Sequence, residues 1–294
     1  MPLALGAWLS ILIAMKTLLV LGHGYSARAL AALLIPQGWT VTGTLRDPAR
    51  ASDLAATGVT PLLWPGDLAP ALACASHVLA SAAPDALGDP FLQAAGEVLR
   101  TARPLWLGYL STTAVYGDHQ GAWVDENTPV TPQSDRAVHR VLAENQWLAS
   151  GLPAHIFRLA GIYGPGRGPF EKVREGSARR IIKPGQVFSR IHVDDIAATL
   201  AASIVAPAPG TIYNVCDDDP APPEDVIGLA AALLGLPEPP AVPYDRAAMS
   251  PMARSFYGES KRVRNTRIKT ALGVTLRYPT YREGLAGLLA AEQI

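Results

Sequence analysis

Thr17-Leu18-Leu19-Val20-Leu21-Gly22-His23-Gly24-Tyr25-Ser26-Ala27 is an apolar run that ends in two glycines and leads into a helix-like segment, residues 28–34. A buried strand, a tight glycine turn and a helix start together present backbone N–H groups to a pyrophosphate. Gly22 permits the sharp turn, Gly24 lets a phosphate approach the backbone, and Ala27 keeps the helix close to its strand. An ordinary strand-to-helix turn can share this motif, so the predicted dinucleotide site depends on the rest of the chain.

Apolar strand-like runs alternate with helix-like segments over the first half of the chain. Continuous apolar strands separated by helices are typical of a parallel sheet covered on both faces, so we predict an α/β protein with a doubly wound parallel sheet. The alternation breaks down after about residue 165, which indicates a smaller C-terminal region with helix signals over 224–234 and 283–291. The expected strands are 17–21, 39–44, 60–64, 77–80, 105–110 and 154–159, and the helices between them include 68–75 and 91–102.

The 294 residues carry 25 basic and 25 acidic side chains, so the formal net charge is zero. This balance gives no overall attraction to nucleic acid or to an anionic membrane, and it favours a small-molecule ligand. Cys74 and Cys216 are far apart and match neither a disulfide framework nor a zinc-ligand spacing. We therefore expect two reduced, buried thiols and no metal site.

Residues 1–15 form an apolar N-terminal stretch. The run from Leu3 to Met15 is too short to span a bilayer, lacks a basic leader and has no small-x-small cleavage site. We expect an upstream extension, a natural start at Met15 and a cytoplasmic protein. A membrane-associating signal is the alternative, and recovery of the mature protein in the membrane fraction would favour it.

The second expected strand ends in Thr44-Leu45-Arg46-Asp47, where a dinucleotide fold contacts the adenosine ribose. An acidic side chain there accepts hydrogen bonds from the free 2′-hydroxyl of NAD, whereas an Arg offers a fork to the 2′-phosphate of NADP. We therefore favour NADP through Arg46. In the alternative, Arg46 and Arg50 are solvated loop charges, and Asp47 binds the ribose of NAD.

Five further motifs, in the expected order along the chain, resemble the extended and atypical short-chain dehydrogenase/reductases, a family that includes nucleotide-sugar epimerases and dehydratases. The resemblance implies a Rossmann fold that binds NAD(P). The motifs are Gly66-Asp67-Leu68, Ser111-Thr112-Thr113-Ala114-Val115-Tyr116-Gly117, Arg158-Leu159-Ala160-Gly161-Ile162-Tyr163-Gly164-Pro165-Gly166, Arg190-Ile191-His192-Val193-Asp194-Asp195 and Tyr213-Asn214-Val215.

The resemblance also implies roles for individual residues. Asp67 would face the adenine, and residues 80–82 would lie along the nicotinamide ribose and the phosphates. Thr112 matches a hydroxyl that hydrogen-bonds the reacting substrate oxygen, and Arg190 matches a substrate-contacting position. Thr112 can instead cap a turn, and Arg190 can instead pair with Asp194 or Asp195.

The chain departs from the family where relatives carry Tyr-x-x-x-Lys. In that pair the Tyr exchanges a proton as hydride moves, while the Lys lowers the Tyr pKa and holds the ribose. The matching positions here are Arg136 and Arg140, and no Tyr occurs between Gly117 and Ile162. The spacing keeps both arginines on one helical face, where Arg140 can hold a ribose or phosphate. Neither can exchange a proton, because a guanidinium stays protonated.

Taken together, the glycine turn, the end of the second strand and the resemblance give the expected cofactor contacts. They are Gly22, Gly24, Tyr25, Ser26, Ala27, Arg46, Asp67, Ala80, Ser81, Ala82 and Arg140.

His139 is the candidate for the missing proton donor, because part of the same helical face can present it and histidine titrates in the useful range. A lone histidine on a helix is more often structural. Tyr116, Tyr163 and His192 are weaker candidates. The expected substrate contacts are Arg136, Tyr163 and Arg190.

The segment from Lys261 to Lys269 concentrates positive charge. It can steer an anionic ligand, but we favour a solvated helix face on which Val263 and Ile268 anchor the segment to the core.

Two functions of different classes remain. The first is an NADP-preferring oxidoreductase or epimerase-like enzyme acting on a sugar-like or nucleotide-sugar-like alcohol or carbonyl. The second is a catalytically silent NAD(P)-binding sensor. We expect a Rossmann domain over 16–165 and a substrate-binding region over 166–294, of which 187–215 returns to the sheet. Relatives often form homodimers through helices, and we expect the same here by analogy.

Overall fold

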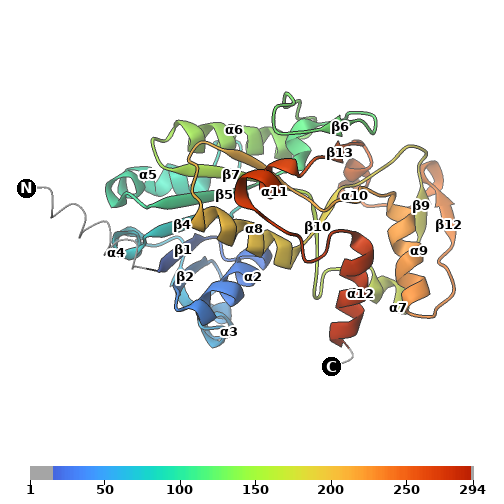
Figure 1. The fold of residues 1–294 in the computed structure, drawn as a ribbon, viewed down its shortest axis with the longest axis horizontal. Coiled ribbons are helices and arrows are strands. Elements are labelled where there is room, and N and C mark those ends of the chain that lie inside the picture. The colour runs from blue at the N-terminus through green and yellow to red at the C-terminus, as the bar shows by residue number, and fades with distance from the viewer. Residues whose placement is uncertain (1–15, 293–294) are drawn as a thin grey trace, which may run out of the picture. The chain divides into compact units, whose positions relative to one another are not determined.

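A seven-stranded sheet organises the chain, in the order β11-β7-β5-β4-β1-β2-β3 (Figure 1). The computed structural model describes residues 16–292, so the predicted N-terminal extension lies outside the described residues. The pairs β1–β2, β1–β4, β2–β3 and β4–β5 are parallel, and the predicted doubly wound α/β fold is confirmed. The strands are β1 (Thr17–Leu21), β2 (Thr40–Leu45), β3 (Thr60–Leu63), β4 (His77–Ala80), β5 (Trp106–Thr112), β7 (Ala154–Leu159) and β11 (Ile212–Val215).

The chain divides into two compact units that alternate along the sequence. The first unit comprises the described residues up to Ser111 together with Val138–Phe157 and Leu200–Ile212. The second comprises Thr112–Ala137, Arg158–Thr199 and the described residues from Tyr213 onward. The domain boundary expected at residue 165 stays a prediction, and part of the segment expected to return to the sheet forms β11.

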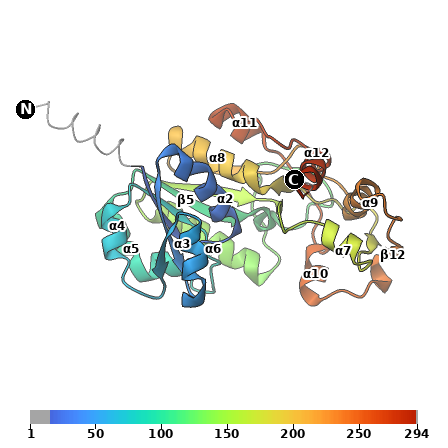
Figure 2. The same ribbon diagram turned by 90° about the horizontal axis from the view of Figure 1, so that it is seen from below.

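The strand β1 lies between β2 and β4, with Leu19 opposite Thr42 and Val78. Residues Leu18 to Leu21 are all buried, because helices cover both faces of a parallel sheet. Helices α2 and α3 lie on one face, and α4, α5 and α6 lie on the other (Figures 1 and 2). Their bounds are α2 (Tyr25–Leu34), α3 (Ala51–Ala56), α4 (Ala69–Cys74), α5 (Pro90–Ala102) and α6 (Asp135–Ala149), with 3-10 turns η1 (Ile35–Gln37) and η2 (Pro48–Arg50).

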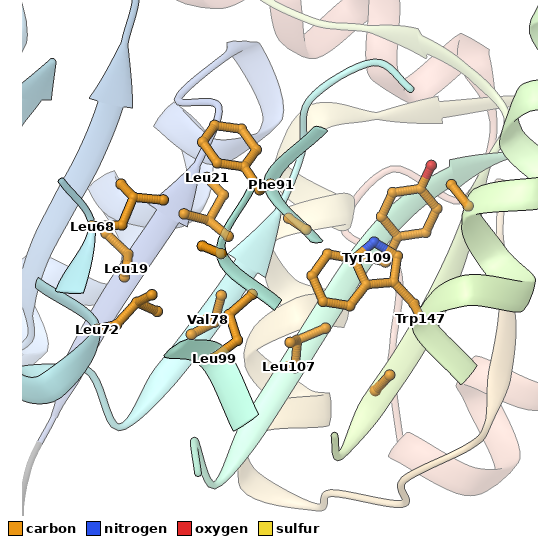
Figure 3. Packing of buried hydrophobic residues seen from close by; sticks show 14 of the residues in the cluster. Leu19, Leu21, Leu68, Leu72, Val78, Phe91, Leu99, Leu107, Tyr109 and Trp147 are labelled. Carbon is orange, nitrogen blue, oxygen red and sulfur yellow. The ribbon is translucent and has the colours of Figure 1, made fainter. Parts of the chain in front are cut away.

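The core of the first unit packs α4, α5 and α6 against the sheet (Figure 3). Leu72 comes from α4, Phe91 and Leu99 come from α5, and Trp147 comes from α6. Burial of each such side chain contributes about 1.5–3 kcal/mol, which holds the carboxyl ends of the strands in place. Cys216 is buried, but the prediction of a buried thiol is wrong for Cys74. In the short helix α4, Leu72 faces the core, and two residues later the chain has turned toward solvent.

The second unit has its own core, which includes Tyr163, Phe170, Val226, Tyr281 and Leu285. Three short parallel strand pairs, β8–β10, β9–β12 and β6–β13, accompany it. The elements are η3 (Thr113–Tyr116), β6 (Trp123–Val124), β8 (Gly161–Tyr163), α7 (Phe170–Arg174), β9 (Arg180–Ile182), β10 (Arg190–His192), α8 (Val193–Val205), α9 (Pro223–Leu233), β12 (Ala241–Pro243), η4 (Tyr244–Arg246), α10 (Pro251–Phe256), β13 (Arg262–Val263), α11 (Thr266–Leu272) and α12 (Tyr281–Glu292).

Candidate functional site

The turn between β1 and α2 has the backbone geometry that a pyrophosphate needs. Gly22 has φ +91°, and a Cβ on it would lie 2.9 Å from the backbone nitrogen of Ala82, so no larger residue fits. The Gly22 N–H donates to Oγ1 of Thr44 at 2.6 Å, which fixes the turn against β2. A Cβ on Gly24 would meet nothing closer than the Gly22 carbonyl oxygen, at 4.0 Å. The backbone is therefore tight at the first glycine and open at the second, as the motif predicts.

The helix α2 begins directly after this turn, at Tyr25, with Gly24 as its N-cap. No side chain of the described residues caps it. Its first N–H groups carry the positive end of the helix dipole, which favours an anionic ligand. Ser26 and Ala27 are buried, so they hold α2 close to the sheet.

Cationic side chains gather where β2 ends. Arg46 is exposed immediately after β2. Burial lowers the pKa of His23, and repulsion from Arg28 on α2 and Arg50 on η2 lowers it further. Asp47 is the N-cap of η2, and its Oδ1 accepts from the Ala49 N–H at 3.0 Å. These arginines offer positive charge to an anionic ligand.

The ends of β3 and β4 carry the remaining expected cofactor contacts of this unit. Asp67 is exposed, and its Oδ1 accepts from the Ala69 N–H at 2.9 Å. Ala80 ends β4 in the core, and the Ser81 N–H donates to the Leu21 carbonyl at 2.9 Å, beside the glycine turn. All the expected cofactor residues thus belong to the first unit, and their roles stay predictions.

Arg140 comes from α6 and contacts the backbone at the ends of β5 and β4. Its Nη1 donates to the carbonyl of Leu110 at 2.5 Å, to the Tyr109 hydroxyl at 3.2 Å and to the carbonyl of Ala82 at 3.5 Å. Its guanidinium also lies over the Tyr109 ring, 5.7 Å from the centroid. Among the described residues, only Nη1 of Arg140 donates hydrogen bonds. The N–H groups of Nε and Nη2 can therefore donate to a ligand.

Several buried polar side chains lie around Arg140, and the sequence analysis missed them. Burial raises the pKa of Tyr109, against the opposing effect of Arg140. Asp89 caps α5 through Oδ1, and burial raises its pKa. Ser111 donates to Glu144 on α6 at 2.5 Å. A tyrosine and an acidic cap inside apolar runs were the only sequence signals of this group.

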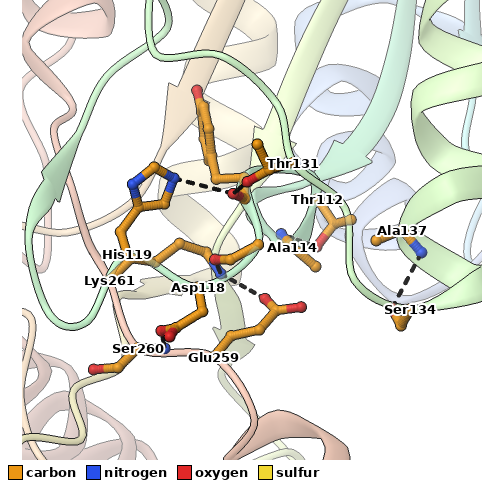
Figure 4. Close-up of polar contacts among 12 residues, drawn as sticks. Thr112, Ala114, Asp118, His119, Thr131, Ser134, Ala137, Glu259, Ser260 and Lys261 are labelled. Atoms are coloured by element: carbon orange, nitrogen blue, oxygen red, sulfur yellow. Dashed lines mark hydrogen bonds and ion pairs between the residues drawn. The ribbon is translucent and has the colours of Figure 1, made fainter.

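Thr112, in the second unit, ends β5, and its Oγ1 accepts from the Ala114 N–H at 3.2 Å (Figure 4). The hydroxyl therefore caps η3, which confirms that Thr112 caps a turn, the alternative to a substrate contact. It retains its own O–H donor, so its predicted substrate contact stays a prediction.

The two α6 positions expected near a substrate have different surroundings. Arg136 is exposed, donates to Ser255 at 3.4 Å and lies 5.3 Å from the Phe256 ring centroid. His139, one turn later, is half-buried. Its catalytic role stays a prediction.

The weaker proton-donor candidates are poorly suited to exchange a proton with a substrate. Tyr116 is buried, donates to Asn214 at 2.8 Å and accepts from Arg158 at 3.0 Å. Burial raises the pKa of Tyr163 and lowers the pKa of His192. The Asp194 N–H donates to Nδ1 of His192, so that nitrogen carries no proton.

Arg190 does not pair with Asp194 or Asp195, which was the alternative to its substrate contact. Asp194 pairs with Arg277, and the Asp195 carboxylate accepts from backbone N–H groups of residues 277 and 278. Arg190 instead donates to the carbonyls of Phe188 and Ala221 at 2.9 and 3.0 Å. The Arg190 side chain thus bonds to backbone outside β10 and α8.

Asp217 faces Arg190 and is a second residue that the sequence analysis missed. It is 1% exposed, and its Oδ2 has no hydrogen-bond partner among the described residues. Burial raises its pKa to about 8, although Arg190 opposes the shift. The carboxyl group is therefore largely protonated at neutral pH.

The basic run is mostly paired within the second unit. Lys261 contacts Glu259 at 2.6 Å and the Gly117 carbonyl at 2.8 Å (Figure 4), and Lys269 contacts Asp218 at 2.5 Å. Val263 and Ile268 are buried, as expected of anchors. Only the part from residue 266 is helical, because residues 262–263 pair with β6 instead.

Residues 16–292 contain no group of three or more His, Cys, Asp or Glu side chains placed to hold a metal ion. None of the helices in that part of the chain combines the length and apolar character needed to cross a bilayer.

A parallel sheet with an open glycine turn at its centre defines the class as a dinucleotide-binding α/β protein. Residues 92–216 match the model of the NAD dependent epimerase/dehydratase family. Protein YeeZ of Escherichia coli (strain K12) is 33% identical over 288 residues, which cover 90% of this chain and 97% of that protein. The chain belongs to the NAD-dependent epimerase/dehydratase family.

Solved structures share the fold of this chain. A functionally unknown conserved protein from Silicibacter pomeroyi DSS is 60% identical, with a TM-score of 0.90 over 95% of this chain and 100% of that chain. The human epimerase family protein SDR39U1, solved with NADPH, is 20% identical, with a TM-score of 0.73 over 95% of this chain and 100% of that chain. The human protein shares the fold.

Proposed function

We propose that this chain binds NADP(H) in its first unit and catalyses hydride transfer on a sugar-like or nucleotide-sugar-like alcohol or carbonyl. One observation carries the proposal: the β1–α2 turn is closed against Ala82 at Gly22 and open at Gly24. That combination is a cradle for a pyrophosphate, and a Cβ at Gly22 would collide with its wall. The family described above acts through NAD, which agrees with such a cradle.

The residues present fit a bound dinucleotide. Backbone N–H groups at Gly24 and in the first turn of α2 would hold its phosphates, and Arg140 would hold the nicotinamide ribose through Nε or Nη2. When bound, the nicotinamide ring supplies a hydride donor or acceptor. Thr112 would donate a hydrogen bond to the reacting oxygen of the substrate, and His139 would exchange its proton.

NADP rather than NAD is supported by the charges at the end of β2. Arg46 offers a guanidinium fork, and Arg28 and Arg50 add positive charge close to His23 in the same turn. The family model names NAD, whereas the human protein that shares the fold was solved with NADPH. We therefore base the preference for NADP over NAD on the side chains of this chain.

Calorimetric titration with NADPH, NADP⁺, NADH and NAD⁺, followed by a spectrophotometric panel of carbonyls, alcohols and nucleotide sugars, tests the proposal. We expect NADPH to bind more tightly than NADH, and at least one substrate to change the absorbance of the bound nucleotide. Absence of binding by all four nucleotides would overturn the proposal.

A catalytically silent sensor is the second candidate. Its support is that Tyr116 and Tyr163 are buried with raised pKa values, which leaves His139 as the main remaining proton donor. A sensor must bind the oxidised and reduced nucleotides with different affinity to convert redox state into a conformational change. Equal affinity for NADP⁺ and NADPH excludes redox sensing, and turnover of any substrate favours the enzyme.

A further inference from the structure

His23, between the two glycines of the turn, has a fixed and unusual position. Its backbone N–H donates to the Thr44 carbonyl at 3.0 Å. Its ring packs on β2 at Gly43, where a Cβ would lie 2.8 Å from the ring carbon Cδ2. Gly43 is therefore small because the imidazole occupies the space above it. The ring is held at the end of β2 where we place the adenosine ribose.

The imidazole is also incompletely satisfied. Its Nε2 is buried and has no hydrogen-bond partner among the described residues. A buried polar atom without a partner is costly to folding, and a ligand, an ion or a water molecule can complete its hydrogen bonding.

The charged groups that face His23 are all cationic. Arg28 faces it from α2 and Arg50 from η2, while β2 contributes Gly43 and Thr44, which do not titrate. Burial and these two arginines lower the pKa of His23 to about 4, so the imidazole is neutral at physiological pH. An anion at this place would reverse the electrostatic part of that effect.

We propose that His23 is a specificity-determining residue for the 2′-phosphate of NADP(H), and that it takes up a proton from solvent when that phosphate binds. The inference rests on the proposed function, because it needs a dinucleotide in the β1–α2 turn. A dianionic phosphate held by Arg28, Arg46 or Arg50 would offset their repulsion and favour the imidazolium form. NADH lacks this phosphate and leaves His23 neutral.

Linkage gives the size of the effect. If the bound phosphate restores the ordinary pKa of about 6.5, NADPH affinity gains about tenfold at pH 5.5 and nothing above about pH 8. At pH 6.5 the protein takes up about half a proton on binding. The 2′-phosphate itself titrates near pH 6, so the comparison needs a variant that keeps the ligand constant.

The experiment is calorimetric titration of the full chain with NADPH and NADH, at pH 6.5, in buffers of different ionisation enthalpy. His23→Gln removes the titration while it retains an amide near the position of Nε2. His119→Gln makes the same chemical change outside the site and is the matched control. We expect wild type and His119→Gln to take up about half a proton more than His23→Gln with NADPH, and no such difference with NADH.

A second measurement uses the wild type and therefore tests the proposal even if the His23→Gln protein folds poorly. In proton NMR of the wild type, we expect one histidine ring resonance to shift its titration midpoint upward by about 2.5 pH units with NADPH and not with NADH. His23→Asn identifies that resonance by its loss. NADPH binding without His23-dependent proton uptake overturns this inference alone. Failure of both nucleotides to bind overturns the proposed function together with it.

Discussion

Nη1 of Arg140 lies 2.5 Å from the carbonyl oxygen of Leu110, so an arginine on α6 is hydrogen-bonded to the end of β5. The family pattern expects a ribose-binding lysine at this position. The arginine places a charge there as a lysine would, but it also bonds to the backbone of the sheet. Its hydrogen bonds within the described residues all involve Nη1, so Nε and Nη2 are the atoms that we propose for the ribose.

Arg140→Met is expected to destabilise the protein by about 1–3 kcal/mol, because the carbonyl of Leu110 and the Tyr109 hydroxyl lose their shared donor. It should also weaken NADPH binding, and Arg140→Lys should restore part of the affinity. Urea unfolding and titration with NADPH measure the two effects. The fragment 2′,5′-ADP, which lacks the nicotinamide half, is the control. Equal weakening for NADPH and 2′,5′-ADP would contradict the ribose contact.

Gly22→Ala is expected to destabilise the protein more than Gly38→Ala. Both glycines have positive φ, +91° and +84°, so both variants carry a similar backbone strain. Only the alanine at position 22 meets another residue, because nothing lies within 4 Å of a Cβ at Gly38. The difference in unfolding free energy should be about 1–3 kcal/mol, and only Gly22→Ala should lose nucleotide binding. Similar losses in both variants would show that contact with Ala82 is unimportant.

Arg46→Asp should lower the ratio of NADPH to NADH affinity by about 10- to 100-fold, since a charge-assisted hydrogen bond contributes about 1.5–3 kcal/mol. Arg246→Asp makes the same charge change at an exposed position in the second unit and should leave the ratio unchanged. Titration calorimetry of the three proteins measures the ratio. An unaltered ratio in Arg46→Asp would remove the assignment of NADP preference to this residue.

Acid should destabilise the protein through buried His77. Burial lowers its folded pKa to about 4, below the unfolded value of 6.5. The folded state therefore binds fewer protons, and stability falls as pH drops from about 6.5 toward 4. At pH 4.5 this one group accounts for about 2–3 kcal/mol relative to pH 7. Urea unfolding at both pH values should show a smaller loss in His77→Gln; an equal loss would contradict the buried neutral imidazole.

We also propose that the chain forms a homodimer through α6, where Val138 and Leu142, one helical turn apart, are exposed. The double variant Val138→Glu/Leu142→Glu should convert a dimer into a monomer in analytical ultracentrifugation. Leu236→Glu, at an exposed apolar position in the second unit, is the control and should stay dimeric. A monomeric wild type would refute the proposal.

Local patterns in the sequence predicted the fold well. The apolar run before Gly22 and the runs at 77–80 and 154–159 all became strands, because a parallel strand buried on both faces needs continuous apolar side chains. The glycine turn could also be predicted, because the backbone conformation that requires Gly22 and Gly24 is set by residues close to them in the sequence.

Contacts between distant segments could not be predicted in this way. His23 meets Gly43, and Arg140 meets Leu110, only after strands and helices have packed. Asp217 is buried beside Arg190, and nothing in the run Asp217-Asp218-Asp219 distinguishes the buried carboxyl from its two neighbours. The two- and three-residue strands of the second unit are too short to show any periodicity.

A crystal structure of the protein grown with excess NADPH tests the central claim most directly. The account predicts a pyrophosphate bound by the backbone N–H groups at Gly24 and at the start of α2, with the 2′-phosphate beside Arg46. Density for NADPH elsewhere, or side chains filling the space outside Gly24 while the ligand is absent, would contradict it.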